Sequence, residues 1–321
     1  MLMHAEAPAF ASLNQGYQRL FQPNRLTLGL VVPLESYPDS PVPSMSDHVQ
    51  RVKLAESLGF AGVWLRDIPL HVPSFGDAGQ IYDPFVYLGL LAGQTQTITL
   101  GVSSIVLPLR HPIHVAKAAA SVDELSGGRR VMGVASGDRP QEYPAFDIDY
   151  QNRGDRFREH FESIRQWQRA SVEASGMAVL PKPTAERLPL LLTGSSQQSD
   201  DWLAANGDGW MTYPREAQTQ TQVIADYRLR AQQSGRAAQP VMEPLYIDLH
   251  EDADAAPEKI HLGYRLGISR LREYLLQRQA IGVNHVALNL RFNRAEPEHT
   301  LNQLAEYLLP LFSSHPTQDA Q

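Results

Sequence analysis

The 321-residue sequence contains no cysteine. Disulfide bonds, thiolate metal sites and a cysteine nucleophile are therefore excluded. Positive charge is also in short supply, because 28 Lys and Arg stand against 35 Asp and Glu and give a formal net charge of -7. The basic residues are scattered rather than gathered into a stripe, so we expect no nucleic acid partner.

Long apolar runs are missing as well. No stretch approaches the roughly 20 apolar residues that a membrane-spanning helix needs, and residues 1–21 lack the apolar core of a signal peptide. We therefore expect no membrane association and a cytoplasmic location. Hydrophobic residues still make up 43% of the chain, which is enough for one large core.

Several catalytic signatures are absent. The sequence has no G-x-G-x-x-G fingerprint, no P-loop, no H-E-x-x-H motif and no G-x-S-x-G elbow. No group of His, Asp and Glu has convincing metal-ligand spacing, so we expect no metal site.

What the sequence does contain is an alternation of two hydrophobic periods. Continuous apolar runs, mostly followed by segments of helical spacing, lie at residues 26–33, 62–67, 98–106, 130–136, 189–194, 209–213, 241–249 and 285–290. Continuous apolar strands are typical of parallel sheets covered on both faces. Eight such units predict an α/β protein with a (β/α)8 TIM barrel, and a doubly wound sheet is the alternative.

The pattern also suggests domain limits. We expect residues 1–24 to form an N-terminal arm, residues 25–313 a single barrel domain, and residues 314–321 a C-terminal tail.

In a (β/α)8 barrel, chemistry is expected where the strands end. The predicted strand ends carry Glu35, Asp67, Ser103 and Ser104, Ser136 to Asp138, Gly194 to Ser196, Tyr213, His250 and Arg291. Hydroxyl groups and small residues dominate this set, and obvious acid/base pairs are few. The set therefore favours the floor of a cofactor site over a hydrolytic centre.

The turn at Gly194, Ser195 and Ser196 lies between a predicted strand and a predicted helix. Small residues and hydroxyls there let backbone N–H groups approach an anion, and a phosphate is the natural occupant. Alternatively, Ser196 or Ser199 only caps the helix.

A second small, polar turn follows the fourth predicted strand. Either Gly137 and Asp138 form a plain turn, or Ser136 is a second phosphate ligand and Arg139 a charged one.

Two residues are candidate catalytic groups. Asp67 ends the second predicted strand, where it could orient a ligand, act as a base, or only pair with an arginine. His71 lies in the following loop, where it is either a catalytic imidazole or a solvated side chain.

Three segments carry a family resemblance. They are FAGVWLRD (60–67), ITLGVSSIVLPLRHPIHVAKAAASVDELSGGRRVMGVASGDRPQEYPAF (98–146) and NRGDRF (152–157). On these segments the chain resembles the bacterial luciferase-like, flavin-dependent monooxygenases, and the similarity runs from about Leu26 to Phe312.

The resemblance implies a barrel that holds reduced flavin at its C-terminal mouth. It also implies a non-prolyl cis peptide under the flavin ring, at the matching pair Ser103–Ser104, where small side chains let a planar ring lie close. The flavin phosphate is implied to lie among Ser136 and Gly137 and among Gly194, Ser195 and Ser196.

The chain departs from luciferase itself at two places. Luciferase has an arginine where this chain has Ser136, so the phosphate is held either with the charge of Arg139 or by neutral donors alone. Luciferase also follows its second strand with an acid and two histidines, whereas this chain has Asp67, Ile68 and Pro69. Light emission is therefore not expected, and His71 is the candidate substitute for the missing histidine. The insertion that some members carry is short or absent near residues 252–268.

The resemblance thus favours an FMN monooxygenase that oxygenates a small organic substrate with O2. Reduced FMN would come from a separate flavin reductase, and a homodimer is the default. One alternative is a deazaflavin-dependent enzyme that transfers hydride on the same barrel. The others are a glycosidase-like hydrolase using Asp138 and Asp248, and a flavin-binding protein without catalytic activity.

Overall fold

The structure is a computed structural model that describes residues 9–313. Residues 1–8, where the expected N-terminal arm begins, and residues 314–321, the expected C-terminal tail, lie outside the described residues.

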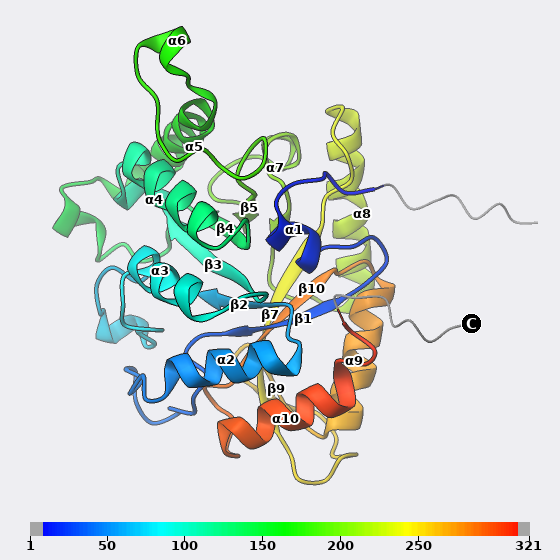
Figure 1. Cartoon of the computed structure of the whole chain (residues 1–321). Coiled ribbons are helices and arrows are strands. Elements are labelled where there is room, and N and C mark those ends of the chain that lie inside the picture. Colours follow the sequence, from blue (N-terminus) through cyan, green and yellow to red (C-terminus); the bar gives the residue numbers. More distant parts are fainter. Residues whose placement is uncertain (1–8, 314–321) are drawn as a thin grey trace, which may run out of the picture.

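Eight parallel strands of the described chain form a closed ring (Figure 1). They are β1 (Thr27–Val31), β2 (Gly62–Leu65), β3 (Thr99–Val106), β4 (Arg130–Ala135), β5 (Leu190–Thr193), β6 (Trp210–Met211), β7 (Val241–Leu249) and β10 (His285–Asn289). Each strand pairs with the next, and β10 pairs with both β7 and β1, which closes the ring. The fold is therefore the predicted (β/α)8 barrel.

Helices surround the ring. They are α2 (His48–Leu58), α3 (Pro84–Gln94), α4 (Pro112–Leu125), α5 (Arg153–Arg169), α7 (Asp200–Asn206), α8 (Ala217–Gln233), α9 (Ile268–Ala280) and α10 (Pro297–Leu308). Proline at the first position fixes the start of α3, α4 and α10, because the nitrogen there needs no helical partner.

Short helical pieces lie in the connections. They are η1 (Pro73–Phe75), η2 (Leu107–Leu109), η3 (Tyr143–Phe146), η4 (Tyr150–Asn152) and α6 (Val172–Ser175). The segment with α6 projects beyond α5, away from the body of the protein (Figure 1).

The two largest apolar clusters of the described residues lie outside and inside the ring of strands. Alternate strand residues such as Leu28, Leu100 and Met132 belong to the large cluster that includes the surrounding helices. The other strand residues fill the interior, where Trp64 and Val131 pack with α1 (Gln15–Leu20). Residues 10–21 therefore close the N-terminal end of the barrel interior.

A hydrogen-bonded chain crosses this interior. The Trp64 indole donates to Nε2 of His285 at 2.8 Å, and His285 Nδ1 lies 2.7 Å from the Thr27 hydroxyl, which donates to the Leu20 carbonyl at 2.7 Å. Because indole can only donate, His285 must carry its proton on Nδ1. Burial lowers the pKa of His285 to about 3, so the ring is neutral.

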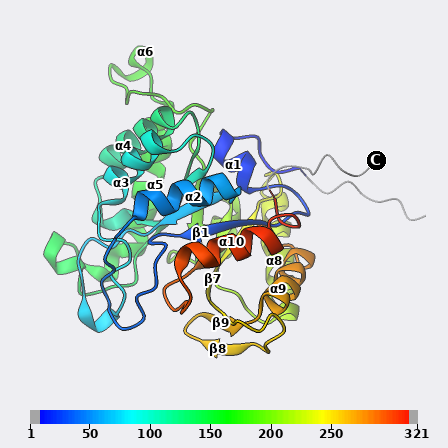
Figure 2. The same ribbon diagram turned by 60° about the horizontal axis from the view of Figure 1, so that its bottom comes forward.

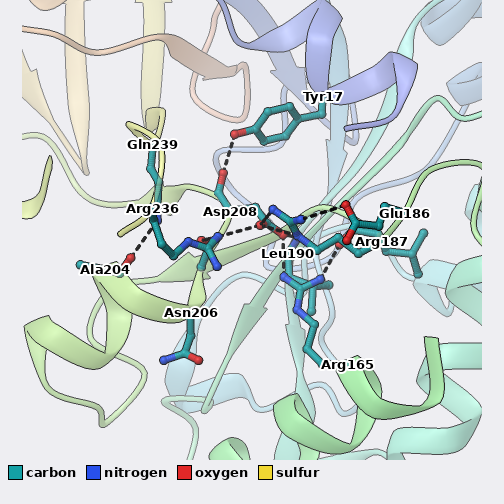
Figure 3. A network of polar contacts seen from close by, with 12 residues as sticks. Tyr17, Arg165, Glu186, Arg187, Leu190, Ala204, Asn206, Asp208, Arg236 and Gln239 are labelled. Atoms are coloured by element: carbon teal, nitrogen blue, oxygen red, sulfur yellow. Dashed lines mark hydrogen bonds and ion pairs between the residues drawn. The ribbon is translucent and has the colours of Figure 1, made fainter. Parts of the chain in front are cut away.

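A network of polar contacts fixes the N-terminal face of the barrel (Figure 3). Asp208 is buried before β6, and its carboxylate pairs with Arg165 at 2.5 Å and with Arg187 and Arg236 at 3.0 Å each. The Tyr17 hydroxyl donates to the Asp208 carbonyl at 2.7 Å, which links α1 to the network.

A hairpin of β8 (Glu258–Ile260) and β9 (Gly263–Leu266) lies beside β7 (Figure 2). It occupies the region where a short or absent insertion was expected. The strand β6 has only two residues, so the outer half of β7 pairs with β9, from Tyr246 to Leu249. A Cβ on Gly263 would lie 1.8 Å from the Tyr246 carbonyl oxygen, so this close pairing requires glycine.

Candidate active site

The C-terminal half of β3 carries the two serines. A cis peptide joins Ser103 to Ser104, as the resemblance implies. The Ser104 hydroxyl hydrogen-bonds to the Thr193 hydroxyl on β5 and lies 3.8 Å from the Met211 sulfur. The Ser103 hydroxyl approaches the Leu65 carbonyl on β2 at 3.4 Å. Both serines are only half-buried, so they lie at the border between the core and the mouth.

Between these strands, β4 contributes a residue without a side chain. A Cβ on Gly133 would lie 2.4 Å from the Met211 sulfur and 2.9 Å from the Ser104 hydroxyl. The surface between Ser104 and Met211, here called the cofactor floor, therefore consists of backbone, hydroxyl and thioether groups. It carries no charge.

The turn after β5 has an unusual backbone. Gly194, Ser196 and Gln197 adopt positive φ angles of 55°, 47° and 60°. The Ser196 hydroxyl donates to the Thr193 carbonyl at 2.8 Å, and Ser199 rather than Ser196 accepts from the α7 backbone. Within residues 9–313, the backbone N–H groups of Ser195 and Ser196 donate no hydrogen bond.

Two successive free N–H groups in a left-handed turn form an anion-binding concavity. A Cβ placed on Gly194 would meet open space, with nothing within 4 Å. A phosphate group therefore fits this turn, on the observed geometry of the backbone rather than on the serine side chains alone.

The start of α5 packs against the same turn. A Cβ on Gly154 would lie 2.8 Å from the Gln197 Cβ, and the Gln198 amide donates to the Gly154 carbonyl at 2.8 Å. The 17-residue helix thus directs the positive end of its dipole at the turn. Sequence reasoning missed Gly154 and Gln198, because only their tertiary contact shows that they belong together.

The turn after β4 lies on the neighbouring strand. Ser136 is buried, and its carbonyl accepts from the Tyr143 hydroxyl. Gly137 has a φ of 79°, and a Cβ there would lie 2.6 Å from the Tyr143 hydroxyl oxygen. The strand order therefore brings Ser103 and Ser104, Ser136 and Gly137, and the Gly194–Ser196 turn to three adjacent strand ends.

Arg139 contacts other residues than the turn at 194–197. Its Nη2 donates to the Asp77 carbonyl at 3.1 Å, and its guanidinium lies over the Phe75 ring at 4.6 Å. It is buried, and its Nη1 finds no acceptor among the described residues. Burial lowers the pKa of Arg139.

Asp67 is held by ion pairing. Arg110 donates to both of its carboxylate oxygens, at 2.9 and 2.7 Å, and the Val106 backbone donates to it at 3.1 Å. Arg110 also reaches Asp83, the N-cap of α3, at 2.8 Å. Asp67 therefore joins the ends of β2 and β3 to the start of α3.

His71 is exposed in the loop between β2 and α3. Its imidazole makes no hydrogen bond to any residue that the structure describes.

The carboxylates proposed for a hydrolase are not a free pair. Asp248 is buried and ion-pairs with Arg294 at 3.3 Å and with Arg265 at 3.5 Å. No group of three or more His, Asp or Glu that could hold a metal ion occurs within residues 9–313.

Comparison with known proteins establishes the family. The model of the luciferase-like monooxygenases matches residues 26–309, so the chain belongs to this family of oxidoreductases. The recognition made from the three sequence segments is confirmed.

Relatives within the family use different cofactors. An F420-dependent hydroxymycolic acid dehydrogenase of Mycobacterium tuberculosis is 30% identical over 201 residues, which cover 59% of this chain and 54% of the relative. The oxygenase component of a flavin-dependent trigonelline monooxygenase of Acinetobacter baylyi is 30% identical over 145 residues, or 44% and 39% of the two chains.

A solved structure confirms the architecture. An F420-dependent secondary alcohol dehydrogenase superposes with a TM-score of 0.73 at 16% identity, covering 89% of this chain and 99% of the other. At that identity the likeness shows the fold alone. Among the described residues, no helix is long and apolar enough to span a membrane.

Proposed function

We propose that this chain is a luciferase-like monooxygenase that binds reduced FMN and oxygenates a small organic substrate with O2. The bound flavin would supply the electrons that activate O2. The protein would position the flavin and the substrate and exclude water from them.

The observation that carries this proposal is the turn at residues 194–197. Its two free N–H groups, the start of α5 beside it and the open space at Gly194 suit a phosphate. The uncharged floor of Ser103 and Ser104 lies two strands away, which suits a planar ring system attached to that phosphate.

The remaining residues take supporting roles in this proposal. Ser136 and Gly137 line the cofactor on the strand between the ring and the phosphate. Asp67 positions the ring or the substrate through Arg110, since both of its oxygens are engaged in that pair. His71 would act only when its loop brings it over the site, and Arg139 would add positive charge.

A second candidate is a hydride-transferring enzyme that uses the deazaflavin F420. The 30% identical dehydrogenase of Mycobacterium tuberculosis favours it, because that match covers more of this chain than the match to the trigonelline monooxygenase. The turn at residues 194–197 could bind a phosphate group of either cofactor.

We also propose a separate flavin reductase as a partner and a homodimer as the assembly. No dinucleotide fingerprint occurs in the sequence, so reducing equivalents would have to arrive with the flavin. The exposed face of α3 carries Val86, 73% exposed, and Leu90, 46% exposed, and this apolar surface suits a second copy of the chain.

The test is a titration of the protein with oxidised and reduced FMN, FAD and F420, followed by absorbance and fluorescence. Reduced FMN should bind in the micromolar range or tighter and support O2 consumption with a reductase. Ser104→Leu should weaken binding at least tenfold, because the larger side chain would occupy the ring position. Ser57→Leu, on the exposed side of α2, should bind normally.

Each outcome has one meaning. Uptake of F420 alone would replace the monooxygenase by the hydride-transfer enzyme. Tight FMN binding without turnover on a broad substrate panel would leave a flavin carrier. Absence of binding to all of these cofactors would remove the cofactor site.

A further inference from the structure

A second charged group lies at the same end of the barrel as the proposed cofactor site. Arg66 directly follows β2, and Arg291 lies just beyond the end of β10. Both form ion pairs with the carboxylate of Asp77, at 2.5 and 3.3 Å. Their side chains are 23% and 13% exposed, and that of Asp77 is 9% exposed.

One carboxylate does not use the hydrogen-bonding capacity of two guanidinium groups, which carry five N–H donors each. Within the described part of the chain, Arg66 donates only from Nη1. Arg291 donates from Nη2 to the Ser40 carbonyl at 3.2 Å, and its buried Nε has no acceptor. Donors therefore remain available at both arginines.

The Asp77 carboxylate has further partners besides these two arginines. Arg139 adds a third guanidinium through its bond to the Asp77 carbonyl, and its Nη1 is also unpaired among residues 9–313. The Asp77 carboxylate must in addition accept from the Tyr37 hydroxyl at 3.2 Å and from the Gly79 backbone at 2.8 Å. Arg66 and Arg291 thus share one carboxylate that already has other donors, whereas Arg139 also has the charges of Glu142 and Asp138 nearby.

Aromatic side chains surround Arg291. The Arg291 guanidinium lies 5.1 Å from the Tyr37 ring centre and 5.2 Å from that of Phe292. Tyr246 packs against Phe292 at 5.4 Å and against His261 of the β8–β9 hairpin at 5.8 Å. A fixed guanidinium beside an aromatic wall suits a ligand with an apolar body and an anionic end.

The group also adjoins the proposed flavin floor. Leu65 of β2 pairs with Val102 of β3, and the Ser103 hydroxyl approaches the Leu65 carbonyl. Arg66, the residue that directly follows β2, therefore lies beside the Ser103–Ser104 pair.

We propose that Arg66 and Arg291 bind the carboxylate or sulfonate group of the substrate, whose apolar body packs against Tyr246 and Phe292. That the bound anion is the substrate rests on the proposed function, whereas the anion site itself does not. Asp77 occupies part of this site when no ligand is bound, and a ligand anion competes with it for the two arginines.

The experiment measures the binding of matched probes by calorimetry, on cofactor-free protein and on protein loaded with whichever flavin it binds. The probes are benzoate, benzenesulfonate and the neutral benzamide. Wild-type protein should bind one of the anions at least tenfold more tightly than benzamide, and 0.5 M salt should reduce this preference. The stronger of the two anions identifies the headgroup.

Variants separate binding from a structural role. Arg66→Gln and Arg291→Gln should each reduce the anion preference to below twofold, while Arg230→Gln should keep it, because this arginine of α8 is 33% exposed and pairs with Asp201 and Asp226 instead. Asp77→Asn should raise anion affinity severalfold, because it removes the competing carboxylate. A merely structural ion pair would give the opposite sign or no change.

Equal binding of benzoate, benzenesulfonate and benzamide to the wild-type protein would overturn this proposal. So would an anion preference that persists in both arginine variants, or an Asp77→Asn protein that binds anions no more tightly than the wild type. The cofactor titration fails or succeeds independently, because the cofactor-free protein is measured as well.

Discussion

Two carboxylates at opposite ends of the barrel are each surrounded by arginines, and they differ in how completely those arginines are used. At the N-terminal face, Asp208 is fully enclosed and receives Arg165, Arg187, Arg236 and the Leu190 backbone N–H (Figure 3). At the C-terminal face, Asp77 receives Arg66 and Arg291, which keep unused donors.

The arginines of the N-terminal face are also anchored by backbone carbonyls. Arg165 donates to the Leu188 carbonyl at 2.8 Å, and Arg236 donates to the Gly207 carbonyl at 2.6 Å. No buried nitrogen of these arginines lacks a partner among the described residues. Burial alone would raise the pKa of Asp208, but Arg165 and Arg187 outweigh it and hold this pKa below its usual value.

The comparison separates a stabilising ion cluster from one that suits a ligand. A buried charge group whose members satisfy one another holds elements together, whereas one with free donors can still accept a partner. This division agrees with the general behaviour of (β/α)8 barrels, in which the C-terminal face binds ligands and the N-terminal face provides stability.

The largest expected effect is at the N-terminal face. Asp208→Asn should lower the free energy of unfolding by about 3–5 kcal/mol, because three arginines lose their shared carboxylate. Asp77→Asn should cost less than half as much, since the Asp77 side chain is 9% exposed against 0% for Asp208 and pairs with two arginines rather than three. Urea denaturation of both variants measures the difference, and equal losses would erase the distinction between the two clusters.

The second effect is a loss of stability in acid that arises from His285 in the barrel interior. His285 has a pKa of about 3 when folded and 6.5 ordinarily, so the unfolded chain takes up the proton first as the pH falls. Its contribution to stability should therefore be present above pH 6.5 and decline by about 1.4 kcal/mol for each pH unit below that, until about pH 3.

His285→Gln should be less stable at neutral pH but lack this part of the acid dependence. His114→Gln, at an exposed position of α4, should keep the wild-type slope. Denaturation curves at pH 7, 6 and 5 measure both, and identical slopes in the wild type and His285→Gln would contradict the neutral buried imidazole.

A smaller effect is expected at the β8–β9 hairpin. Gly263→Ala should detach β9 from β7 and cost ~1–3 kcal/mol, because the new Cβ meets the Tyr246 carbonyl. Hydrogen exchange of residues 258–266 should rise while exchange in β1 to β5 is unchanged. Gly89→Ala, where a Cβ meets nothing within 4 Å, is the control and should be neutral or stabilising.

The smallest effect is expected on cofactor affinity at the turn of residues 194–197. Ser195→Ala should weaken cofactor binding about 2–10-fold, since the backbone N–H groups remain. Its free energy of unfolding should stay within about 0.5 kcal/mol of the wild type, as for an exposed residue. A titration with the bound cofactor checks the first value, and unchanged affinity would remove Ser195 from the site.

The sequence predicted the eight barrel strands because each is a continuous apolar run, and β7 was placed with its observed limits. It did not predict the hairpin, since EKI and GYRL are short and half-exposed, and their pairing depends on β6 being only two residues long. The local motif at residues 194–196 was visible as small residues and hydroxyls.

Other parts of the site depend on distant contacts. Arg110 engages both oxygens of Asp67 across 43 residues of chain, so the state of that carboxylate could not be read from its neighbours in sequence. The position of Arg291 was noted at a strand end, but its side-chain direction follows only from the closed ring. Its partner Asp77 lies in a loop with no local signal.

The short β6 has an implication for how this protein can change. The edge that it leaves on the outer part of β7 accepts a hairpin whose loss or lengthening leaves the closed ring intact. That hairpin brings His261 against Tyr246. Replacing residues 258–266 could therefore change ligand preference in evolution or by design, while the barrel strands continue to determine the fold.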